Sequence, residues 1–350
     1  MHRISNTDIM KKYATLKDIG RALNISPATV SRALADRWDA NAETKKLVLA
    51  EAKRQNYKPN PLAKRLQNRH SKTIGIIVPQ LKGSFFSSVI SGIQKAVDEA
   101  GFQLLITQSQ ESMELELRNL KLLENNMVEG IIISINSEGE NSDYYQDLID
   151  NGIPIVFFNR VSSSIIAPKV IIDDYKLAFF ATEHLIYNGF KKIYHFAGPE
   201  KLAVTIERKR GFLDAMKKHK REILENTVLA TNVFTDKAYE TMKMLIQKND
   251  LPDAIFCIND YAALGALRAI KEEGLKCPDD IALVGFSETE MAQLIEPPLT
   301  SILQPTFEMG ETAVRLLLEQ INQTPPPEPE TVYLTAKMNV RKSSMNINRS

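Results

Sequence analysis

The feature that most restricts the fold is an alternation, from Thr73 onward, between short apolar runs and segments with helical periodicity. A continuous apolar run is typical of a parallel strand that is buried on both faces. The first runs are "TIGIIVP", "FQLLIT", "VEGIIIS" and "IPIVFF", and a second series extends from "KVIID" to "IALVGFS". Helical segments such as "FFSSVISGIQKAVDEAG" separate them. We therefore expect two α/β lobes with parallel sheets, side by side, and a cleft at the carboxyl ends of the strands.

The residues before this region predict a small all-α head. Thr15 is suited to cap a helix, with Asp18 three residues later in a variant of the capping box. Ser26 caps a second helix, and Pro27 takes its first turn, where a missing N–H costs nothing. A third helix is expected from about residue 42 to about residue 56. Such an arrangement forms a helix-turn-helix unit.

The segment "YKPNPLAKRLQNRHSK" joins the head to the lobes. Asn60 can cap a helix with Pro61 at its first position, and only about two turns follow. A helix this short is marginal in water, so we expect it to order only when something holds it.

The predicted domains are a flexible N-terminus (1–14), a helix-turn-helix domain (15–58), a hinge helix and linker (59–72) and a two-lobed body (73–345). Lobe 1 is expected to comprise residues 73–171 and 302–330, and lobe 2 residues 172–301 and 331–341.

Charge is distributed unevenly along the chain, whose formal net charge is +1. Residues 1–72 carry 16 lysines and arginines against 6 aspartates and glutamates, so the head has a net charge of +10 and the remainder −9. A basic head on an acidic body indicates a nucleic-acid-binding unit joined to another domain. A basic tail without a target is the alternative, and the helical pattern of the head argues against it.

Several classes of protein are disfavoured by what the sequence lacks. The N-terminus has no apolar signal region and no apolar run approaches ~20 residues, so we expect a cytoplasmic chain without a membrane segment. Cys257 and Cys277 form no C-x-x-C pair, which suits a reducing compartment. No nucleotide-binding or zinc-protease motif is present, and "GFSET" has Thr289 where a nucleophile elbow needs glycine. We therefore expect no enzyme activity, metal or cofactor.

From about Thr15 to about Arg341 the chain resembles the LacI/GalR family of bacterial transcription regulators. The resemblance is carried, in this order, by "ATLKDIGRALNISPATVSRAL", "NYKPNPLAKRL", "SKTIGIIVP", "PIVFFNR", "RKRGFLDAM", "AIFCINDYAALGALRAI", "DDIALVGFSETE" and "PPLTSILQPTFEMG". It implies a repressor that binds a palindromic DNA operator as a dimer or tetramer and responds to a small molecule, most often a sugar. The C-terminus adds no heptad repeat, which favours the homodimer.

The second helix of the head is expected to enter a DNA major groove, which is about 12 Å wide. Its small side chains allow the backbone to approach closely. The resemblance implies that Pro27, Ala28 and Arg32 face the bases, and Arg32 can reach a guanine edge with its bidentate fork. The expected phosphate-binding residues are Thr15, Ser26, Thr29 and Ser31. In the alternative, the helix packs on its neighbours and Arg32 is only solvated.

The resemblance gives the hinge helix a second role in reading DNA, through Asn60, Ala63, Lys64 and Leu66. The residue at the position of Leu66 wedges between bases in the minor groove, which unstacks a step and bends the duplex. Lys64 is placed for a phosphate, whereas in the alternative Leu66 packs on the body. A hinge ordered by a partner and by DNA would allow ligand-driven movement of the lobes to change DNA affinity.

Small polar ligands in such clefts need aromatic walls and a few fixed polar groups. The candidates at strand ends, which by resemblance contact ligand from both lobes, are Phe85, Phe86, Asn159, Asp173, Arg208, Asn259, Asp260 and Ser287. One of the two phenylalanines can instead belong to the core. Asp173 and Asp260 can also cap the helices that follow them.

The sequence departs from the family where aspartate is usual, at Gln80, Asn159 and Ser287. Fewer carboxylates leave fewer acceptors for sugar hydroxyls. A phosphosugar, a sugar acid and no ligand at all therefore remain open. Two other functions also remain open: a solute-binding protein, which would need an export signal, and a sugar-sensing module without DNA binding.

Overall fold

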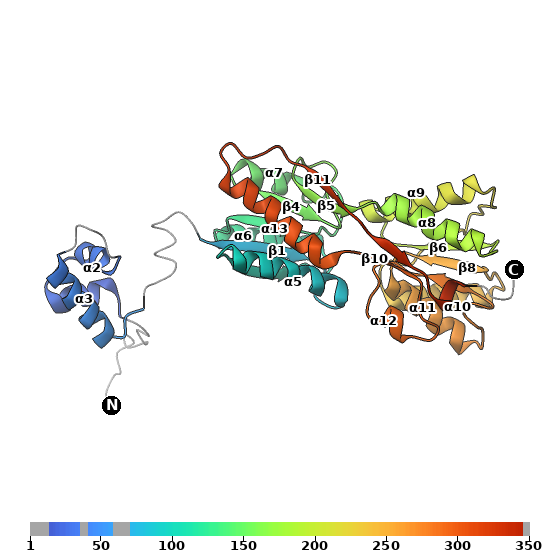
Figure 1. Cartoon of the computed structure of the whole chain (residues 1–350), viewed down its shortest axis with the longest axis horizontal. Helices are drawn as coiled ribbons and strands as arrows, with labels where there is room; N and C mark the ends of the chain where they lie inside the picture. The colour runs from blue at the N-terminus through green and yellow to red at the C-terminus, as the bar shows by residue number, and fades with distance from the viewer. Residues whose placement is uncertain (1–13, 36–40, 59–70, 346–350) are drawn as a thin grey trace, which may run out of the picture. The chain divides into compact units, whose positions relative to one another are not determined.

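The computed structural model describes residues 14–35, 41–58 and 71–345 (Figure 1). It divides into two compact units, Met1–Ser71 and Lys72–Ser350, which are the head and the body. The predicted N-terminal segment 1–14 and hinge segment 59–72 lie almost entirely outside the described residues.

The head contains three helices around a small apolar core. The helices are α1 (Leu16–Leu23), α2 (Pro27–Leu34) and α3 (Ala42–Arg54), and the core consists of Ile19, Val30, Ala33, Val48 and Ala52. Thr15 and Asp18 form the expected capping box, and the Ser26 side chain accepts a hydrogen bond from the backbone N–H of Thr29. The turn between α1 and α2 is tight, because a Cβ at Gly20 would lie 2.7 Å from the carbonyl oxygen of Ile25.

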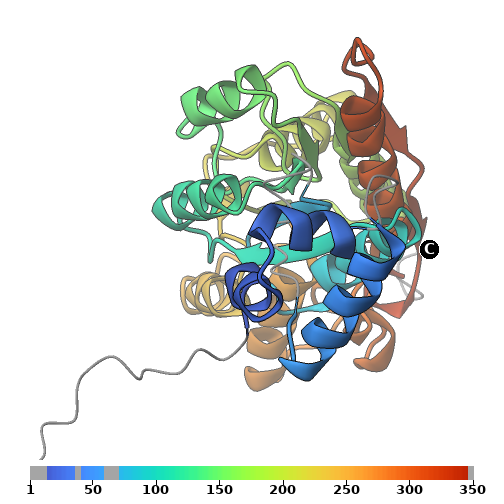
Figure 2. The ribbon, with the colours of Figure 1, turned by 90° about the vertical axis from the view of Figure 1, so that its left-hand side faces the viewer.

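The first lobe of the body is a six-stranded parallel sheet in the order β11-β5-β4-β3-β1-β2. Its strands are β1 (Thr73–Val78), β2 (Gln103–Gln108), β3 (Gly130–Ile133), β4 (Ile155–Phe158), β5 (Lys169–Ile172) and β11 (Thr331–Leu334). Its helices are α5 (Ser84–Glu99), α6 (Met113–Asn125), α7 (Ser142–Asp150) and α13 (Thr306–Asn322). Helices α6 and α7 lie on one side of the sheet, and α5 and α13 lie on the other (Figure 2). The residues of β1, β3 and β4 are all buried, as a sheet covered on both faces requires.

The second lobe is a four-stranded parallel sheet in the order β7-β6-β8-β9. Its strands are β6 (Ile193–Ala197), β7 (Val228–Ala230), β8 (Ala254–Cys257) and β9 (Ala282–Val284). Its helices are α8 (Asp174–Tyr187), α9 (Ala203–Lys218), α10 (Thr235–Gln247), α11 (Asp260–Glu272) and the short α12 (Met291–Leu294). An antiparallel pair, β10 (Ser301–Leu303) and β12 (Lys337–Asn339), runs between the two lobes (Figure 1).

One strand, β11, belongs to the first lobe although the predicted domain bounds assign it to the second. The prediction places residues 331–341 in lobe 2, yet β11 pairs with β5, which pairs with β4 of the first lobe. A short apolar strand has the same pattern in either sheet, so periodicity cannot choose its neighbours. The edge that β5 leaves open accepts β11, so the first lobe includes Thr331–Leu334.

Glycines allow the paired helices of the body to approach closely. In the α5–α13 pair, a Cβ at Gly92 would lie 2.1 Å from the carbonyl oxygen of Phe307, and one at Gly310 would lie 2.2 Å from that of Val89. In the α10–α11 pair, a Cβ at Gly265 would lie 2.1 Å from the carbonyl oxygen of Thr235. These contacts are with backbone, which cannot move aside as a side chain can. The helices must therefore separate if any of these glycines gains a side chain.

We predict that Gly265→Ala lowers the free energy of unfolding of the body by about 1 to 3 kcal/mol, the usual cost of overpacking. Alanine favours a helix over glycine, so a destabilising sign reports the contact between helices and not helix propensity. Urea denaturation followed by circular dichroism measures the change. Ser91→Ala, at an exposed position of α5, serves as the control and should change stability by less than about 0.5 kcal/mol. A Gly265→Ala variant as stable as the parent would contradict this account of the α10–α11 contact.

Candidate functional site

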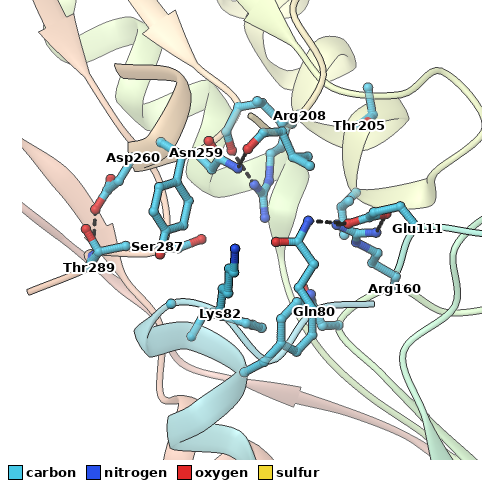
Figure 3. Close-up of a pocket in the computed structure, with 18 residues that line it drawn as sticks. Gln80, Lys82, Glu111, Arg160, Thr205, Arg208, Asn259, Asp260, Ser287 and Thr289 are labelled. Carbon is cyan, nitrogen blue, oxygen red and sulfur yellow. Dashed lines mark hydrogen bonds and ion pairs between the residues drawn. The ribbon is translucent and has the colours of Figure 1, made fainter. Parts of the chain in front are cut away.

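A cleft of about 740 Å³, which includes space open to solvent, lies between the lobes (Figure 3). Most of its walls are loops that follow strands β1, β2, β4, β8 and β9 at their carboxyl ends. The lining residues that carry side-chain chemistry are Gln80, Lys82, Phe85, Phe86, Glu111, Asn159, Arg160, Thr205, Arg208, Asn259, Asp260, Tyr261, Ser287 and Thr289.

A buried ion pair between Arg208 of α9 and Asp174 of α8 forms one wall of the cleft. The Arg208 Nε donates to Asp174 Oδ1 at 2.8 Å, and its other nitrogen, Nη2, lies 2.7 Å from the same oxygen. Nη1 donates to the carbonyl oxygen of Ile258 at 2.6 Å, and the guanidinium lies 3.5 Å from the centre of the Phe286 ring. Burial raises the pKa of Asp174, and the charge of Arg208 opposes that rise. The pair holds Arg208 in one orientation toward the cleft.

A second ion pair lies in the first lobe. Arg160 donates from Nη1 to Glu111 Oε2 at 2.6 Å and from Nη2 to Glu111 Oε1 at 3.1 Å. The Gln80 side-chain amide also donates to Glu111 Oε1, at 3.2 Å. Glu111 thus receives hydrogen bonds from residues after β1 and β4, and it ties these two loops together.

The Asn259–Asp260 pair begins α11 at the cleft. Asn259 caps the helix by accepting from the N–H of Ala262 at 2.8 Å, and its amide donates to the carbonyl oxygen of Val233 at 3.0 Å. Asp260 is fully buried and accepts from the Ser301 hydroxyl at 2.5 Å and the Thr289 N–H at 2.6 Å. Burial raises the pKa of Asp260 to about 6, against the effect of these hydrogen bonds.

The sequence-predicted cleft residues are brought together with one exception. Phe85, Phe86, Asn159, Arg208, Asn259, Asp260 and Ser287 line the cleft. Asp173 does not: it is exposed and caps α8 by accepting from the N–H of Lys176 at 2.9 Å. Its neighbour Asp174 is buried and pairs with Arg208, and it is not among the residues that line the cleft either. The Asp173 side chain bonds to the first turn of α8 and so stays at the end of this helix, whereas the Asp174 side chain points toward α9.

The two phenylalanines differ in burial. Phe86 is buried in the core of the first lobe, whereas Phe85 is half-buried, and their rings meet edge-on with centroids 5.1 Å apart. Phe85 therefore offers more of its surface to the cleft than Phe86 does.

Several cleft residues are missing from the sequence-derived set: Lys82, Glu111, Thr205, Tyr261 and Thr289. Two of them could have been found by a simple rule, because Lys82 and Glu111 lie within four residues after the apolar runs that form β1 and β2. Thr205 lies in the first turn of α9, and no sequence pattern indicates that it faces the cleft.

On the head, the three residues expected to face DNA bases are exposed. Pro27 and Ala28 lie at the start of α2, and Arg32 lies in its last turn. Ser26 and Thr29, expected at phosphates, bond to each other through their hydroxyl groups at 2.9 Å, and Thr15 donates its hydroxyl to Asp18. Ser31 is half-buried. The hinge residues Asn60, Ala63, Lys64 and Leu66 lie outside the described residues.

The described residues hold no cluster of histidine, cysteine, aspartate and glutamate that could bind a metal ion. Among the helices within those same ranges, none is both long and apolar enough to cross a membrane. Cys257 and Cys277 are both free thiols.

A helix-turn-helix head with an exposed reading helix, joined to a two-lobed body with a polar cleft, defines the class of ligand-responsive DNA-binding proteins. The family described as "Bacterial regulatory proteins, lacI family" matches residues 15–60, and "Periplasmic binding proteins and sugar binding domain of LacI family" matches residues 71–340. The chain belongs to the LacI family of bacterial transcription regulators.

Individual relatives agree with this assignment. The transcriptional repressor CytR of Escherichia coli K12 is 32% identical over 88% of this chain and 90% of its own length. The repressor PurR of Photobacterium profundum is 29% identical over 96% of this chain and 100% of its own. These relatives are repressors and not enzymes. Among solved structures, the CelR regulator–cellobiose complex superposes with a TM-score of 0.72 at 27% identity, covering 94% of this chain and 99% of that one. The Lac repressor dimer bound to operator has a TM-score of 0.80 at 24% identity over 95% and 100%, which shows a shared fold.

We predict that Arg208→Met lowers the free energy of unfolding by about 3 to 5 kcal/mol, because it leaves the Asp174 charge buried without a partner. The double variant Arg208→Met, Asp174→Leu should recover most of that loss, since no buried charge remains. Urea denaturation provides the measurement. Arg210→Met is the control on the same helix; Arg210 is exposed and pairs with Glu207, so its loss should cost less than about 1 kcal/mol. Equal losses for Arg208→Met and Arg210→Met would contradict the role given to the buried pair.

We also predict a specific pH dependence from Asp260. Its pKa is raised to about 6 in the folded chain from an ordinary value of 3.8, so between these values the folded state holds a proton that the unfolded state has lost. The stabilisation is present below about pH 4 and is lost as pH rises through about 6. The stability of the parent relative to Asp260→Asn should fall by about 3 kcal/mol over that range.

The comparison with Asp260→Asn cancels the other titrating groups. Burial lowers the pKa of His195 to about 4, so this histidine gives the opposite slope, equally in both proteins. Urea denaturation of both proteins at a series of pH values measures the difference. A difference in stability that stays constant from about pH 4 to about pH 7 would show that Asp260 has no raised pKa.

Proposed function

We propose that this protein is a cytoplasmic, sequence-specific repressor that binds a palindromic operator as a homodimer, with an affinity set by a small polar effector in the cleft. The observation that carries the proposal is the exposure of α2, where Pro27 and Ala28 at its start and Arg32 in its last turn present small side chains and one arginine. A surface this flat permits close approach to base edges, and Arg32 supplies a bidentate donor for guanine.

The proposed DNA contacts divide into reading and positioning. Arg32 reads a guanine, and Ala28 is limited to apolar contact such as a thymine methyl. Ser26 and Thr29 stand at the start of α2, and Ser31 lies near its middle; their hydroxyl groups suit phosphates. Ser26 and Thr29 keep acceptor and donor capacity beyond the bond between them, since each hydroxyl has one hydrogen and two lone pairs. Thr15 plays the same part at the start of α1.

The hinge segment extends the proposed interface. Leu66 is proposed as an apolar wedge in the minor groove and Lys64 as a phosphate contact, with Asn60 capping and Ala63 packing close to the duplex. Because α2 has so few polar side chains, it can read only a short stretch of DNA base pairs. Specificity therefore depends also on Leu66 and on two symmetric copies of the head.

Two features of the body support self-association and control by an effector. The edge strand β2 exposes 40% of Ile106, and α12 exposes 77% of Leu294, so apolar surface is available for a second copy. Between the lobes, the N–H of Glu138 donates to the carbonyl oxygen of Lys201, and Lys201 pairs with Glu140 at 2.9 Å. Because these contacts are a backbone hydrogen bond and an exposed ion pair, a ligand that touches both lobes can bias their closure.

The relatives support a sugar-like effector. One regulator of the same fold was solved with cellobiose, and a LacI-family regulator from Enterococcus faecium, at 26% identity and a TM-score of 0.69 over 78% of this chain and 98% of that one, was solved with ribose. Phe85 offers a ring face, and Arg208, Asn159 and Asn259 offer polar groups from both lobes. This mixture suits a polyhydroxylated ring.

We predict that Arg32→Ala weakens binding to the chain's own promoter DNA by about 10- to 100-fold, which corresponds to loss of one bidentate base contact. Binding to unrelated DNA should change much less, and circular dichroism should show an intact head. Gel-shift titration on both DNAs measures the ratio. Arg54→Ala removes the same charge from α3, where Arg54 pairs with Glu51, and should preserve the ratio. If Arg32→Ala retains the parent's preference for promoter DNA, Arg32 does not read bases.

A further inference from the structure

The charges that line the cleft are compensated by protein partners, with one exception. Arg208 pairs with Asp174, and Arg160 pairs with Glu111 through two hydrogen bonds. These two arginines therefore bring no excess charge to a ligand. Asp260 is the remaining carboxylate, and both of its oxygens already accept hydrogen bonds within a fully buried site.

Lys82 is the exception. It follows β1, lines the cleft and forms no ion pair with any residue that the structure describes. Figure 3 shows its side chain extending into the middle of the pocket, away from the Arg160–Glu111 pair. An ammonium group in a partly enclosed cleft without a counter-charge favours an anion there.

The helix that begins next to Lys82 adds to this preference. Helix α5 starts at Ser84 after Gly83, which supplies no side-chain cap, and its first turn has no acidic residue. Gly83, Phe85 and Phe86 line the same cleft, so the N-terminal turn of this 16-residue helix borders the pocket. Free N–H groups and the positive end of the helix dipole both favour negative charge. A side chain at Gly83 would close the approach, because its Cβ would meet the Tyr261 hydroxyl.

Polar groups elsewhere in the cleft suit the neutral part of such a ligand. Thr205 lines the cleft from α9 with only 2% of its surface exposed, and its hydroxyl, which lies beside Gly198, has no hydrogen-bond partner among the described residues. An unpaired buried hydroxyl costs free energy unless a ligand or water bonds to it. Thr205 lies on the opposite lobe from Lys82, so one molecule that reaches both would bridge the lobes.

From this arrangement we propose that the effector is an anionic sugar derivative, whose phosphate or carboxylate binds Lys82 and the N-terminus of α5 while its hydroxyl groups meet Thr205 and the second lobe. The proposal rests on the proposed function, since it names the ligand of the same cleft. A cationic ligand is disfavoured because neither Glu111 nor Asp260 is free to pair with it. A neutral sugar would leave the Lys82 charge in the cleft without a partner.

The test uses thermal unfolding of the full chain at constant pH and ionic strength. Inorganic phosphate and acetate serve as probes of the anion subsite, each compared with chloride. We expect at least one of them to raise the Tm by about 2 to 4 °C at concentrations well above its dissociation constant. The same shift is expected for Lys191→Met, the matched control, because Lys191 is exposed and precedes β6 at the strand end away from the cleft. Lys82→Met should lose the shift.

A second arm distinguishes the two anion sources. Glucose 6-phosphate, glucuronate and glucose are compared on the parent and on Lys82→Met. If phosphate raises the Tm more than acetate, and glucose 6-phosphate raises it more than glucuronate, the effector is a sugar phosphate. If acetate and glucuronate give the larger shifts, the effector is a sugar acid. An unchanged shift in Lys82→Met, or no shift of the parent with either phosphate or acetate, would overturn the proposal.

Failure here is separable from failure of the proposed function. The thermal shifts need no DNA, and promoter binding needs no anion probe. A chain that binds its promoter but ignores phosphate and acetate loses only the anionic assignment.

Discussion

The ion pair between Arg208 and Asp174 holds together the wall of the cleft on the second lobe. Arg208 reaches from α9 to Asp174 at the start of α8, to the carbonyl of Ile258 after β8 and to the ring of Phe286 after β9. Four separate elements thus meet at one guanidinium. Burying such a pair is costly unless every donor finds an acceptor, and here most do. A wall fixed in this way presents its remaining polar groups to a ligand without rearrangement, which reduces the entropy lost on binding.

The two walls of the cleft differ in how they are joined. Within each lobe, helices pack through glycines such as Gly92 and Gly265, where backbone meets backbone. Between the lobes, the described contacts at the cleft include the exposed Lys201–Glu140 pair and the Gly83–Tyr261 approach. Rigid lobes with a weaker junction can move as bodies when a ligand favours one closure.

Much of this arrangement could be predicted from the sequence, and the exceptions have physical causes. Local signals predicted the caps at Thr15 and Ser26, which are set by neighbouring residues. The apolar runs mark strands, but only those inside the sheet, such as β1, β3 and β4, are buried, whereas the edge strand β2 has no buried residue. The sheet that takes β11 is decided by distant partners, which a short run does not encode. Whether Asp173 or Asp174 pairs with Arg208 depends on the direction in which α8 starts. The unpaired hydroxyl of Thr205 is visible only once α9 is placed against the cleft.

The central claim is that this chain reads DNA sequence through symmetric copies of its head. The most direct measurement is selection of bound duplexes from a random-sequence pool by the full chain, followed by sequencing. We expect an enriched inverted repeat, with a guanine at one fixed position in each half-site and a flexible pyrimidine–purine step at its centre. Recovery of no common sequence, or of a single unsymmetrical site, would contradict the claim.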